Sequence, residues 1–527
     1  MIIAIRTLVL CSIGLAAGVV GADEADDFFA AGHVPRISIR LADGAADRLR
    51  EDPRGYVACT LTIDGDTVHE DVAIKLKGSA GSFQGLDDKP GFTVNMDRFR
   101  PGARFAGLDK FHLNNAAQDP TLLHEWLGGL VFLEAGVPAA RVAHAHVVLD
   151  DRDLGLYVFK EAIDRDFLVR HFADPRGNLY DGGTAVDIDA LVERDEGKDG
   201  VPGADLQALV AACRREDPAE RQAEIAERLD VPAFITFMAL EMMSGHWDGY
   251  CLGHNNYRVY VDPANDGRIR FLPHGMDQLF GDPGAPILEM PATIVAGAVM
   301  QVPEWREAYR TRVRELLPLF DAEERLLARL DPAADRIRPA VAATGDEALA
   351  GWEEAIADLR GRLRARDESL REQAEAPEPE PIHFDGARRA TPAGWSPRTD
   401  TGGAQHEELA GEDGRRRYAI IASGDGPCIA SWRVAVPLPA GTYLLQGLAL
   451  GEGIDATDDE TGSGAGLRIS GEQRTNRVDS DGGWTPLEHR FTLDVPTTVE
   501  LVVELRATAG RVDFNADSLA ILRLSEP

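Results

Sequence analysis

The sequence predicts an α+β protein in two parts, a mixed domain followed by an all-β sandwich, and three observations support this prediction. Short β-type runs with partial alternation of apolar and polar residues fill most of the chain up to about residue 165. Helical patterns dominate from residue 204 to 373. After an acidic, proline-alternating stretch at 375–381, every apolar run is again β-type and is bounded by glycine, proline or aspartate.

The first 165 residues are expected to form a sheet-rich lobe. The β-type runs lie at 57–64, 72–78, 92–96, 144–150 and 154–163, with a helical pattern at 121–136. The order β, β, β, α, β, β is typical of an antiparallel sheet with one helix laid on it. Helices at 231–243, 305–320 and 352–373 then indicate a helical lobe, so we expect a cleft between the two lobes.

The predicted domains are a first domain at 23–373, a linker at 374–383 and a β-sandwich at 384–527. Alternating proline prevents the linker from being helical and favours a semi-extended segment. The sandwich is close in size to an immunoglobulin-like or jelly-roll module.

The N-terminal residues 1–22 are predicted to be a cleaved signal peptide. Arg6 precedes a largely apolar run from Thr7 to Val20, and the small residue Ala22 precedes Asp23. The alternative is a membrane anchor, but the run is shorter than the ~20 apolar residues that a spanning helix needs. We therefore expect a secreted, periplasmic or cell-surface protein with no transmembrane segment in the mature chain.

Composition narrows the possible partners. The 527 residues carry 55 basic and 88 acidic side chains, a formal charge of -33, which favours solubility and argues against binding to nucleic acid. An anionic ligand would therefore require a locally basic cleft or a bound divalent cation.

Polar residues in the order that phosphoryl transfer requires occur between residues 246 and 282. Asp248 follows a helix that ends near Gly245, Asn255 and Asn256 precede a strand, and Asp277 follows a second strand. A kinase needs a carboxylate to accept the proton of the substrate hydroxyl and oxygen ligands to hold magnesium on the phosphates. Asp248 suits the first role, while Asp277 and one of the asparagines suit the second. The alternative is that these residues simply form turns.

A small-residue loop upstream is a candidate for phosphate binding. It contains Gly78, Ser79, Gly81 and Ser82, and Lys89 follows at the start of the next strand. Backbone amides in such a loop can approach phosphates, and a nearby lysine can neutralise them. The alternative is an ordinary hairpin with a solvated lysine.

Glu125, on the helix at 121–136, is the expected partner of Lys89. The alternative is an exposed helical glutamate with no such role.

Several collinear motifs resemble the CotH kinase family of secreted or spore-coat atypical protein kinases. They are KLKGSAG with DDKPGFTV, LNNAAQDPTLLHEWLGGLVFLEAGVP, GLYVFKEAIDRDFL, and GHWDGY with HNNYRVYVD and PHGMDQLFG, within residues 36 to 373. The resemblance implies a divergent two-lobed protein-kinase-like fold that uses ATP and Mg²⁺ or Mn²⁺ to phosphorylate serine or threonine of envelope or secreted proteins.

The same resemblance assigns roles to single residues. Lys89 would hold phosphates with Glu125 in support, and Asp248 would be catalytic. Asn256, in competition with Asn255, and Asp277 would be metal ligands, and Glu161 would lie near the lobe junction.

The sequence departs from the family where Asp-Leu-Asp is common, because it has Gly275-Met276-Asp277. One carboxylate is therefore missing. The alternative function is a pseudokinase that acts as a surface-binding or structural protein with a glycan-binding sandwich.

The C-terminal strands resemble those that close carbohydrate-binding jelly rolls. Such modules stack sugar rings on exposed aromatic side chains, for which Trp432, Tyr443 and Trp484 are candidates. The alternative is that these aromatic residues form the core of the sandwich.

Overall fold

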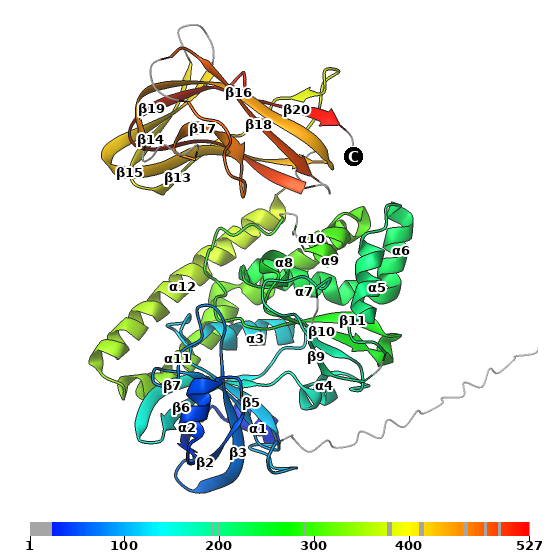
Figure 1. Cartoon of the computed structure of the whole chain (residues 1–527), viewed down its shortest axis with the longest axis vertical. Helices are drawn as coiled ribbons and strands as arrows, with labels where there is room; N and C mark the ends of the chain where they lie inside the picture. Colours follow the sequence, from blue (N-terminus) through cyan, green and yellow to red (C-terminus); the bar gives the residue numbers. More distant parts are fainter. Residues whose placement is uncertain are drawn as a thin grey trace, which may run out of the picture. The chain divides into compact units, whose positions relative to one another are not determined.

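The computed structural model describes residues 24–190, 193–198, 200–288, 291, 293–376, 382–410, 416–456, 462–478, 482–493 and 497–525 (Figure 1). The predicted signal peptide lies outside these residues, and so do residues 377–381 of the predicted linker. The chain forms two compact units, one that ends at Ala374 and one that continues from Glu375.

Seven strands of the first unit form a closed barrel in the order β1-β2-β3-β4-β5-β7-β6. They are β1 (Arg36–Leu41), β2 (Val57–Ile63), β3 (Thr67–Lys77), β4 (Gly91–Asn95), β5 (Lys110–Asn114), β6 (Val142–Leu149) and β7 (Arg152–Glu161). The prediction of an antiparallel sheet is therefore incomplete. It missed β1 and β5, and the barrel closes because β1 pairs in parallel with β6, more than 100 residues away in the chain.

Aromatic rings fill one part of the barrel interior. Phe111 on β5 and Phe159 on β7 stack with ring centroids 4.5 Å apart, and Phe105 and Phe28 extend the cluster. Three helices accompany the barrel, α1 (Glu24–Ala31), α2 (Ala45–Glu51) and α3 (His124–Glu134). The short helix α4 (Arg165–His171) follows β7.

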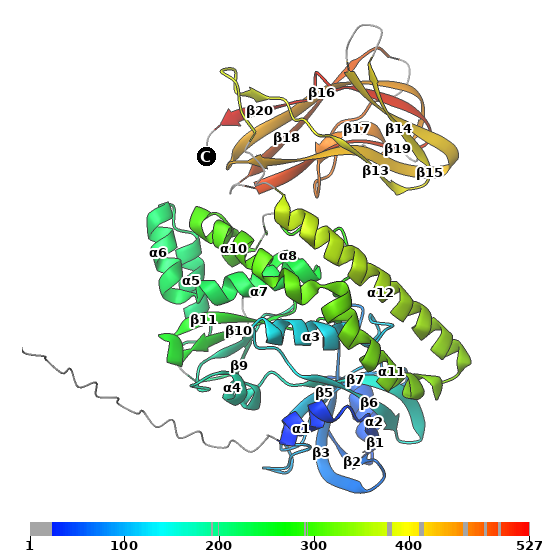
Figure 2. The ribbon, with the colours of Figure 1, turned by 180° about the vertical axis from the view of Figure 1, so that it is seen from behind.

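A second, small sheet belongs to the helical region (Figure 2). Its strand order is β11-β10-β8-β9. Its strands are β8 (Leu179–Asp181), β9 (Glu193–Glu196), β10 (Tyr257–Asp262) and β11 (Arg268–Pro273). The α-helices of this region are α5 (Ala204–Cys213), α6 (Pro218–Arg228), α7 (Val231–Ser244), α8 (Tyr250–Gly253), α9 (Ile294–Met300), α10 (Pro303–Leu316), α11 (Ala328–Ala342) and α12 (Asp346–Glu375). The region also contains the 3₁₀ helices η1 (Pro263–Asn265) and η2 (Leu317–Phe320) and the π-helix η3 (Ala322–Leu327).

Helix α7 is apolar on almost every side and is buried along nearly its whole length. The Asp230 carboxylate caps its first turn, and Gly245 ends it with φ of 65°, a left-handed conformation that favours glycine. The buried guanidinium of Arg366 on α12 donates to the carbonyls of Met242 and Met243. These contacts fix the end of α7, from which the segment containing Asp248 leaves.

The second unit is all β, as predicted. Its strands are β12 (Arg389–Ala390), β13 (Ser396–Thr401), β14 (Ala404–Ala410), β15 (Arg416–Leu438), β16 (Gly441–Ala456), β17 (Gly464–Ile469), β18 (Thr485–Leu493), β19 (Thr497–Asn515) and β20 (Ala520–Ser525). The long strands β15 and β19 pair antiparallel along most of their length. Alternate residues of β15, β16 and β19 point into a shared apolar core.

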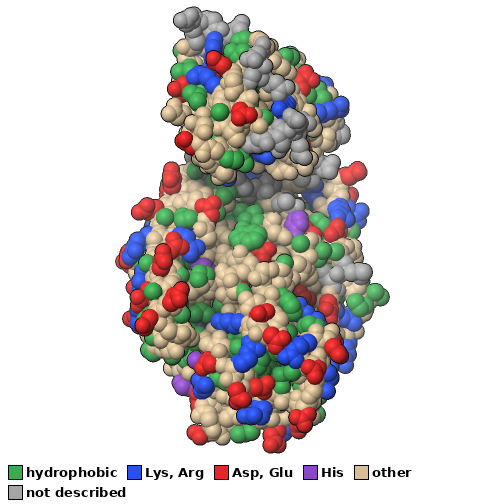
Figure 3. Space-filling model, turned by 60° about the vertical axis from the view of Figure 1, so that its left-hand side comes forward, with side chains coloured by type: hydrophobic (Ala, Val, Ile, Leu, Met, Phe, Trp, Pro, Cys, Tyr) green, Lys and Arg blue, Asp and Glu red, His purple; other side chains and the backbone are tan. Residues whose placement is uncertain are grey.

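Two further features concern the apolar character of the helices and the distribution of charged side chains on the surface. Among the described residues, no helix has both the length and the apolar character that a membrane crossing requires. On the face drawn in Figure 3, acidic and basic side chains are interspersed rather than separated into large patches of one sign.

Candidate functional site

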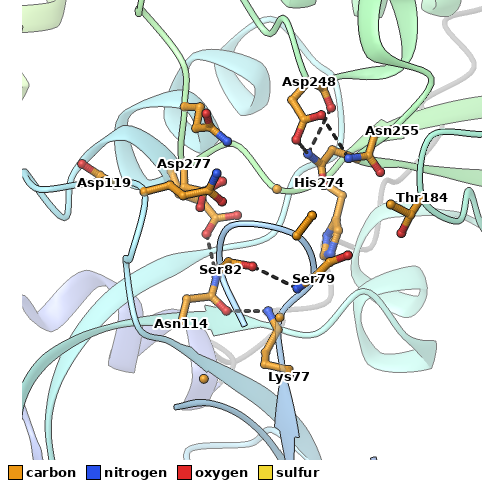
Figure 4. Close-up of a pocket in the computed structure, with 18 of the residues that line it drawn as sticks. Lys77, Ser79, Ser82, Asn114, Asp119, Thr184, Asp248, Asn255, His274 and Asp277 are labelled. Carbon is orange, nitrogen blue, oxygen red and sulfur yellow. Dashed lines mark hydrogen bonds between the residues drawn. The ribbon is translucent and has the colours of Figure 1, made fainter. Parts of the chain in front are cut away.

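A cavity of about 540 Å³ lies in the first unit (Figure 4). Its lining comes from the ends of β3, β5 and β7, from α3, and from the segments around residues 183, 248 and 275. Figure 4 shows Lys77 and Asp248 entering the cavity from opposite sides. A volume of this size suits a small-molecule ligand such as a nucleotide.

We call the side of the cavity that is formed by the barrel strands and α3 the barrel wall. At its centre, Lys160 on β7 forms a buried ion pair with Glu125 on α3. The two side chains are 1% and 2% exposed, so neither charge is solvated by bulk water. Glu125 also receives a hydrogen bond from the Asn114 amide at 2.9 Å. A buried ion pair persists only when further hydrogen bonds satisfy both partners, and this network supplies them.

Lys77, at the end of β3, adds a second ammonium group to this wall. Its Nζ donates to Asn114 Oδ1 at 2.5 Å, so Asn114 bridges Lys77 and Glu125. Among the described residues, Lys77 forms no ion pair. Burial, followed by the charge of Lys160, lowers the pKa of Lys77 to about 8. The wall therefore has two ammonium groups and one carboxylate, which leaves an excess of positive charge.

These charges determine the protonation of two neighbours. Burial alone would raise the pKa of Glu125, but Lys160, Lys77 and the Asn114 amide outweigh it and hold the pKa below its usual value. Burial and Lys160 lower the pKa of His274 well below its usual value, so this imidazole is neutral at pH 7. His274 Nδ1 lies 3.4 Å from Lys160 Nζ, which is compatible with a neutral acceptor.

The opposite wall is built around Asp248, which accepts hydrogen bonds from both predicted asparagines. Asn256 Nδ2 donates to Asp248 Oδ2 at 2.7 Å, and Asn255 Nδ2 donates to Oδ1 at 3.1 Å. Asn256 Nδ2 also donates to the Asp248 carbonyl at 3.0 Å. The Asn256 amide nitrogen is thus used within the protein, and its Oδ1 remains as the atom that can bind a cation.

Glu241 and His246 hold the Asp248 segment in place. The buried Glu241 carboxylate accepts hydrogen bonds from the Tyr250 and Cys251 amides at 3.1 and 2.8 Å. His246 lies 3.3 Å from Glu241 and places its Nε2 3.2 Å from the carbonyl oxygen of Gly275. His246 therefore connects the segment of Asp248 to the segment of Asp277.

Helix α3 fixes the position of Asp277 from the barrel side. His124 Nδ1 lies 3.0 Å from the Asp277 carbonyl oxygen, and Glu125 Oε1 lies 3.4 Å from the Met276 nitrogen. The Asp277 carboxylate lines the cavity, and burial, together with the negative charge of Glu125, raises its pKa. Asp277 is half-buried and has no ion-pair partner among the described residues, so a bound cation would offset its charge.

Gly275 is required by the geometry of this segment. It has φ of 54°, and a Cβ atom at this position would lie 2.2 Å from Asn256 Oδ1. No side chain, and hence no carboxylate, fits here while Asn256 keeps its contacts with Asp248. The glycine that departs from the Asp-Leu-Asp pattern is therefore matched to the position of Asn256.

The predicted small-residue loop lies at the cavity. Gly78, Ser79 and Ser82 belong to its lining, while Gly81 does not. The Ser79 nitrogen donates to Ser82 Oγ at 3.0 Å, and the Ser82 nitrogen donates to the Ser79 carbonyl at 3.1 Å. Gly78 has φ of 116°, and a Cβ there would lie 2.8 Å from Phe83 Cα, so the tight turn requires glycine.

Lys89 is not part of the cavity lining, and the prediction that it pairs with Glu125 is wrong. Its Nζ donates to the Leu156 carbonyl at 3.0 Å and lies 5.0 Å from the centre of the Tyr157 ring. Lys160 takes the position beside Glu125 instead. The signal that could have identified Lys160 is its place at the end of an apolar strand, because a buried lysine almost always has a specific partner.

Glu161 also lies outside the cavity lining. It accepts hydrogen bonds from Arg141 and Arg170, whose side chains form a separate charged cluster. Successive side chains of a strand point to opposite faces, so Lys160 and Glu161 necessarily point in opposite directions. Lys77 and Lys160 are the two lysines of the cavity lining, and the sequence prediction missed both.

The donor set of the cavity fits a hard divalent cation. Asp248, Asn256 and Asp277 offer oxygen atoms only, which Mg²⁺ and Mn²⁺ prefer. Within the described ranges, no three His, Cys, Asp or Glu side chains are grouped as a metal-binding cluster. Magnesium commonly binds only one or two protein carboxylates and completes its shell with water and phosphate, so its binding does not require such a cluster.

The aromatic candidates of the second unit occupy different environments. Trp432 and Tyr443 are buried in the apolar core, which confirms the alternative interpretation for these two residues. Trp484 is half-buried, and the Arg417 guanidinium lies 5.3 Å from its ring centre.

Comparison with protein families gives one match, which covers more than half of the chain. A family described as "CotH kinase protein" matches residues 74–369. These residues include every charged side chain of the cavity described above.

Curated relatives carry related names. The chain is 22% identical to invasin CotH2 of Rhizopus delemar over 278 residues, which is 48% of this chain and 46% of that protein. It is 23% identical to the inner spore coat protein H of Bacillus subtilis over 263 residues, 45% of this chain and 70% of that protein. The match thus spans about half the length of the fungal relative.

Solved structures with partial similarity include carbohydrate-binding modules. TmCBM61, solved in complex with beta-1,4-galactotriose, is 16% identical and covers 24% of this chain and 88% of its own, with a TM-score of 0.19. The xylan-binding module CBM15 is 15% identical and covers 26% and 94%, also with a TM-score of 0.19.

Proposed function

This chain belongs to the CotH kinase protein family, and from that premise we propose that it is an exported protein kinase. It transfers the γ-phosphoryl group of ATP to a serine or threonine hydroxyl of an envelope or secreted protein. The observation that carries the proposal is the pairing of a positively charged wall, Lys77 and Lys160, with an oxygen-rich wall, Asp248, Asn256 and Asp277, across one cavity.

Asp248 is the group that receives the acceptor's proton. Its two carboxylate oxygens each accept one amide hydrogen bond, which orients the carboxylate and leaves lone pairs toward the cavity. The acceptor O–H bond breaks as the new O–P bond forms, and the bond between the β- and γ-phosphates breaks to release ADP. Since this reaction needs little covalent chemistry from the protein, positioning and charge supply most of the catalysis.

Lys160 and Lys77 bind the phosphates from the barrel wall. Glu125 orients Lys160, and Asn114 orients Lys77, so both ammonium groups have defined positions before the nucleotide arrives. Pre-set donors of this kind stabilise the charge of the transferring phosphoryl group without reorganisation.

A divalent cation, Mg²⁺ or Mn²⁺, would be held by Asn256 Oδ1 and the Asp277 carboxylate and would neutralise phosphate charge when bound. We expect ATP alone to be disfavoured, because five acidic side chains of the lining outnumber its two lysines: Asp119, Glu125, Asp181, Asp248 and Asp277 against Lys77 and Lys160. ATP is therefore expected to bind weakly without the cation.

The absence of a carboxylate at position 275 does not by itself favour a pseudokinase. Gly275 leaves space for the Asn256 amide, which contacts Asp248 directly. The remaining oxygen ligands satisfy the low number of protein ligands that magnesium commonly uses.

Export and glycan attachment are further parts of the proposal. The apolar N-terminal run favours export through a cleaved signal peptide. In this setting, the second unit would keep the kinase near a glycan-containing surface.

The test is transfer of labelled phosphate from ATP by the purified chain without residues 1–22, with Mg²⁺ or Mn²⁺, to an envelope protein fraction. Wild type is expected to label protein at serine or threonine, and Asp248→Asn to reduce labelling by at least ~10²-fold because the proton acceptor is lost.

Asp248→Asn keeps the size of the side chain, so a melting temperature close to that of wild type would separate lost chemistry from lost folding. Equal labelling by wild type and Asp248→Asn would refute the proposed activity. Binding of ATP without any transfer would support the pseudokinase alternative.

A further inference from the structure

Among the described residues, Trp247 is the one exposed tryptophan, while Trp126, Trp305 and Trp484 are half-buried. The Trp247 side chain is 54% exposed, although a ring of this size normally buries most of its surface. Trp352, Trp395 and Trp432 are buried, and their indole N–H groups donate to the carbonyls of Thr121, Pro392 and Ala419. Across the described part of the chain, the Trp247 indole has neither a hydrogen-bond partner nor a ring contact.

The backbone that carries Trp247 is held tightly even though its side chain is exposed. A Cβ atom on Gly249 would lie 2.5 Å from His246 Nδ1 and 2.6 Å from Glu241 Oε1. A Cβ atom on Gly253 would lie 2.8 Å from the Trp247 carbonyl oxygen and 3.0 Å from Asp248 Cα. Helix α8 thus packs directly against the backbone of Trp247 and Asp248. The backbone position from which the exposed ring projects is therefore fixed.

Trp247 also lies next to the reacting group. It lines the same cavity as Asp248, the following residue in the chain. Consecutive Cα atoms are ~3.8 Å apart, and residues of an extended peptide follow one another at ~3.3 Å. An acceptor hydroxyl at hydrogen-bond distance from Asp248 therefore brings the neighbouring residues of the acceptor within reach of Trp247.

We propose that Trp247 is a binding platform for the acceptor polypeptide and contacts an apolar side chain beside the phosphorylated serine or threonine. This inference rests on the proposed kinase function and deepens it by naming a determinant of acceptor choice. Tryptophan suits the role because it offers a large, rigid apolar surface at a small cost in conformational entropy. Its free N–H can in addition bind a backbone carbonyl of the acceptor.

The experiment compares serine peptides that carry leucine or glycine at each position flanking the serine. Wild type is expected to show about a tenfold higher kcat/KM for the leucine peptide at one flanking position, and Trp247→Ala to lose this preference through a higher KM for the peptide. The KM for ATP is expected to stay within twofold in Trp247→Ala, and Trp247→Phe to keep most of the preference.

Val169→Ala is the matched control, because Val169 is another exposed apolar residue, on α4, and lies outside the cavity lining. Its peptide preference should equal that of wild type. A wild type without flanking preference, or a Trp247→Ala variant that retains it, would overturn the inference while leaving the kinase proposal intact.

If wild type transfers phosphate to no peptide, the labelling of the envelope protein fraction still decides the proposed function, and calorimetry tests the platform separately. Peptides with alanine in place of serine should bind wild type about tenfold more tightly than Trp247→Ala when leucine is present. Peptide binding that is equal in both proteins would overturn the inference. Binding of a soluble oligosaccharide, but of no peptide, at Trp247 would overturn it as well and assign the platform to a glycan.

Discussion

The two walls of the cavity differ in how their charges are balanced. On the barrel wall, Lys160 is paired with Glu125 and both are buried, while Lys77 contributes an ammonium that, among the described residues, bonds only to the neutral Asn114. On the opposite wall, among the described residues, neither Asp248 nor Asp277 has an ion-pair partner. One wall has spare positive charge and the other spare negative charge, so a ligand that contains both phosphates and a divalent cation complements both walls together.

Lys160→Met is expected to have the largest effect on stability and on phosphate transfer, because it removes the ammonium group that pairs with Glu125. Removing one partner leaves Glu125 as a buried unpaired carboxylate, which costs about 3–5 kcal/mol of unfolding free energy. Urea unfolding measures this loss, and phosphate transfer should fall to background.

The double variant Lys160→Met, Glu125→Gln provides the control. It should recover part of the stability without recovering transfer. If Lys160→Met unfolds at the same urea concentration as wild type, the barrel wall is not organised around this pair.

Gly275→Asp tests whether the opposite wall depends on a glycine. A side chain there clashes with Asn256 Oδ1 and requires a left-handed backbone, so the cost is about 1–3 kcal/mol, and transfer should drop rather than rise. Melting temperature and the Mg²⁺ dependence of transfer are the measurements. Gly281→Asp is a useful control, because a Cβ at Gly281 meets no close atom. Higher activity or tighter metal binding in Gly275→Asp would contradict the requirement for glycine and would show that the natural site is weakened by the missing carboxylate.

Lys77→Met tests the spare positive charge. ATP affinity should fall about tenfold, or ~1.4 kcal/mol, and adenosine, which has no phosphate, should bind wild type and variant equally. Lys75→Met is the matched control, because Lys75 lies on the same face of β3 but outside the cavity lining.

The pH dependence of ATP binding tests the same group. With its pKa lowered to about 8, Lys77 is mainly an ammonium at pH 7 and mainly neutral at pH 9. Affinity of wild type for ATP should therefore decrease as pH rises through this interval, and calorimetry should show a weaker decrease in Lys77→Met. An identical pH profile in both proteins would contradict the assignment.

Lys89→Ala is expected to have the smallest effect. It removes one hydrogen bond to the Leu156 carbonyl and a contact with the Tyr157 ring, which together stabilise by about 1 kcal/mol. ATP affinity should remain that of wild type in a calorimetric titration. A large loss of ATP binding would contradict this expectation and would show that Lys89, like Lys160 in our proposal, contributes to the nucleotide site.

Local sequence patterns predicted much of the fold. Alternation identified most barrel strands, and the capping residues around α7 agree with its predicted end near Gly245. Helix α12 runs from Asp346 to Glu375 and so is longer at both ends than the predicted 352–373. The closing contact between β1 and β6 was not predicted, because a parallel pairing between distant segments has no short-range signal.

Some residues of the candidate site could likewise be predicted from the sequence, and others could not. That Asp248, Asn256 and Asp277 lie around one cavity was predictable, because polar residues at the ends of a helix and two strands follow one another in a short stretch of sequence. The identity of the lysine that pairs with Glu125 was not predictable. Lys89, Lys77 and Lys160 are all strand-associated lysines, and sequence alone does not say which of them faces Glu125.

By itself, the sequence determined the α+β composition, the change to an all-β second unit, and the order of the oxygen-bearing residues. Only the tertiary structure decided that Lys160 rather than Lys89 pairs with Glu125, that Glu161 points away, and that Gly275 makes room for Asn256. The physical reason is that composition and periodicity act within a segment, whereas pairing and steric fit depend on which distant segments the folded barrel brings together.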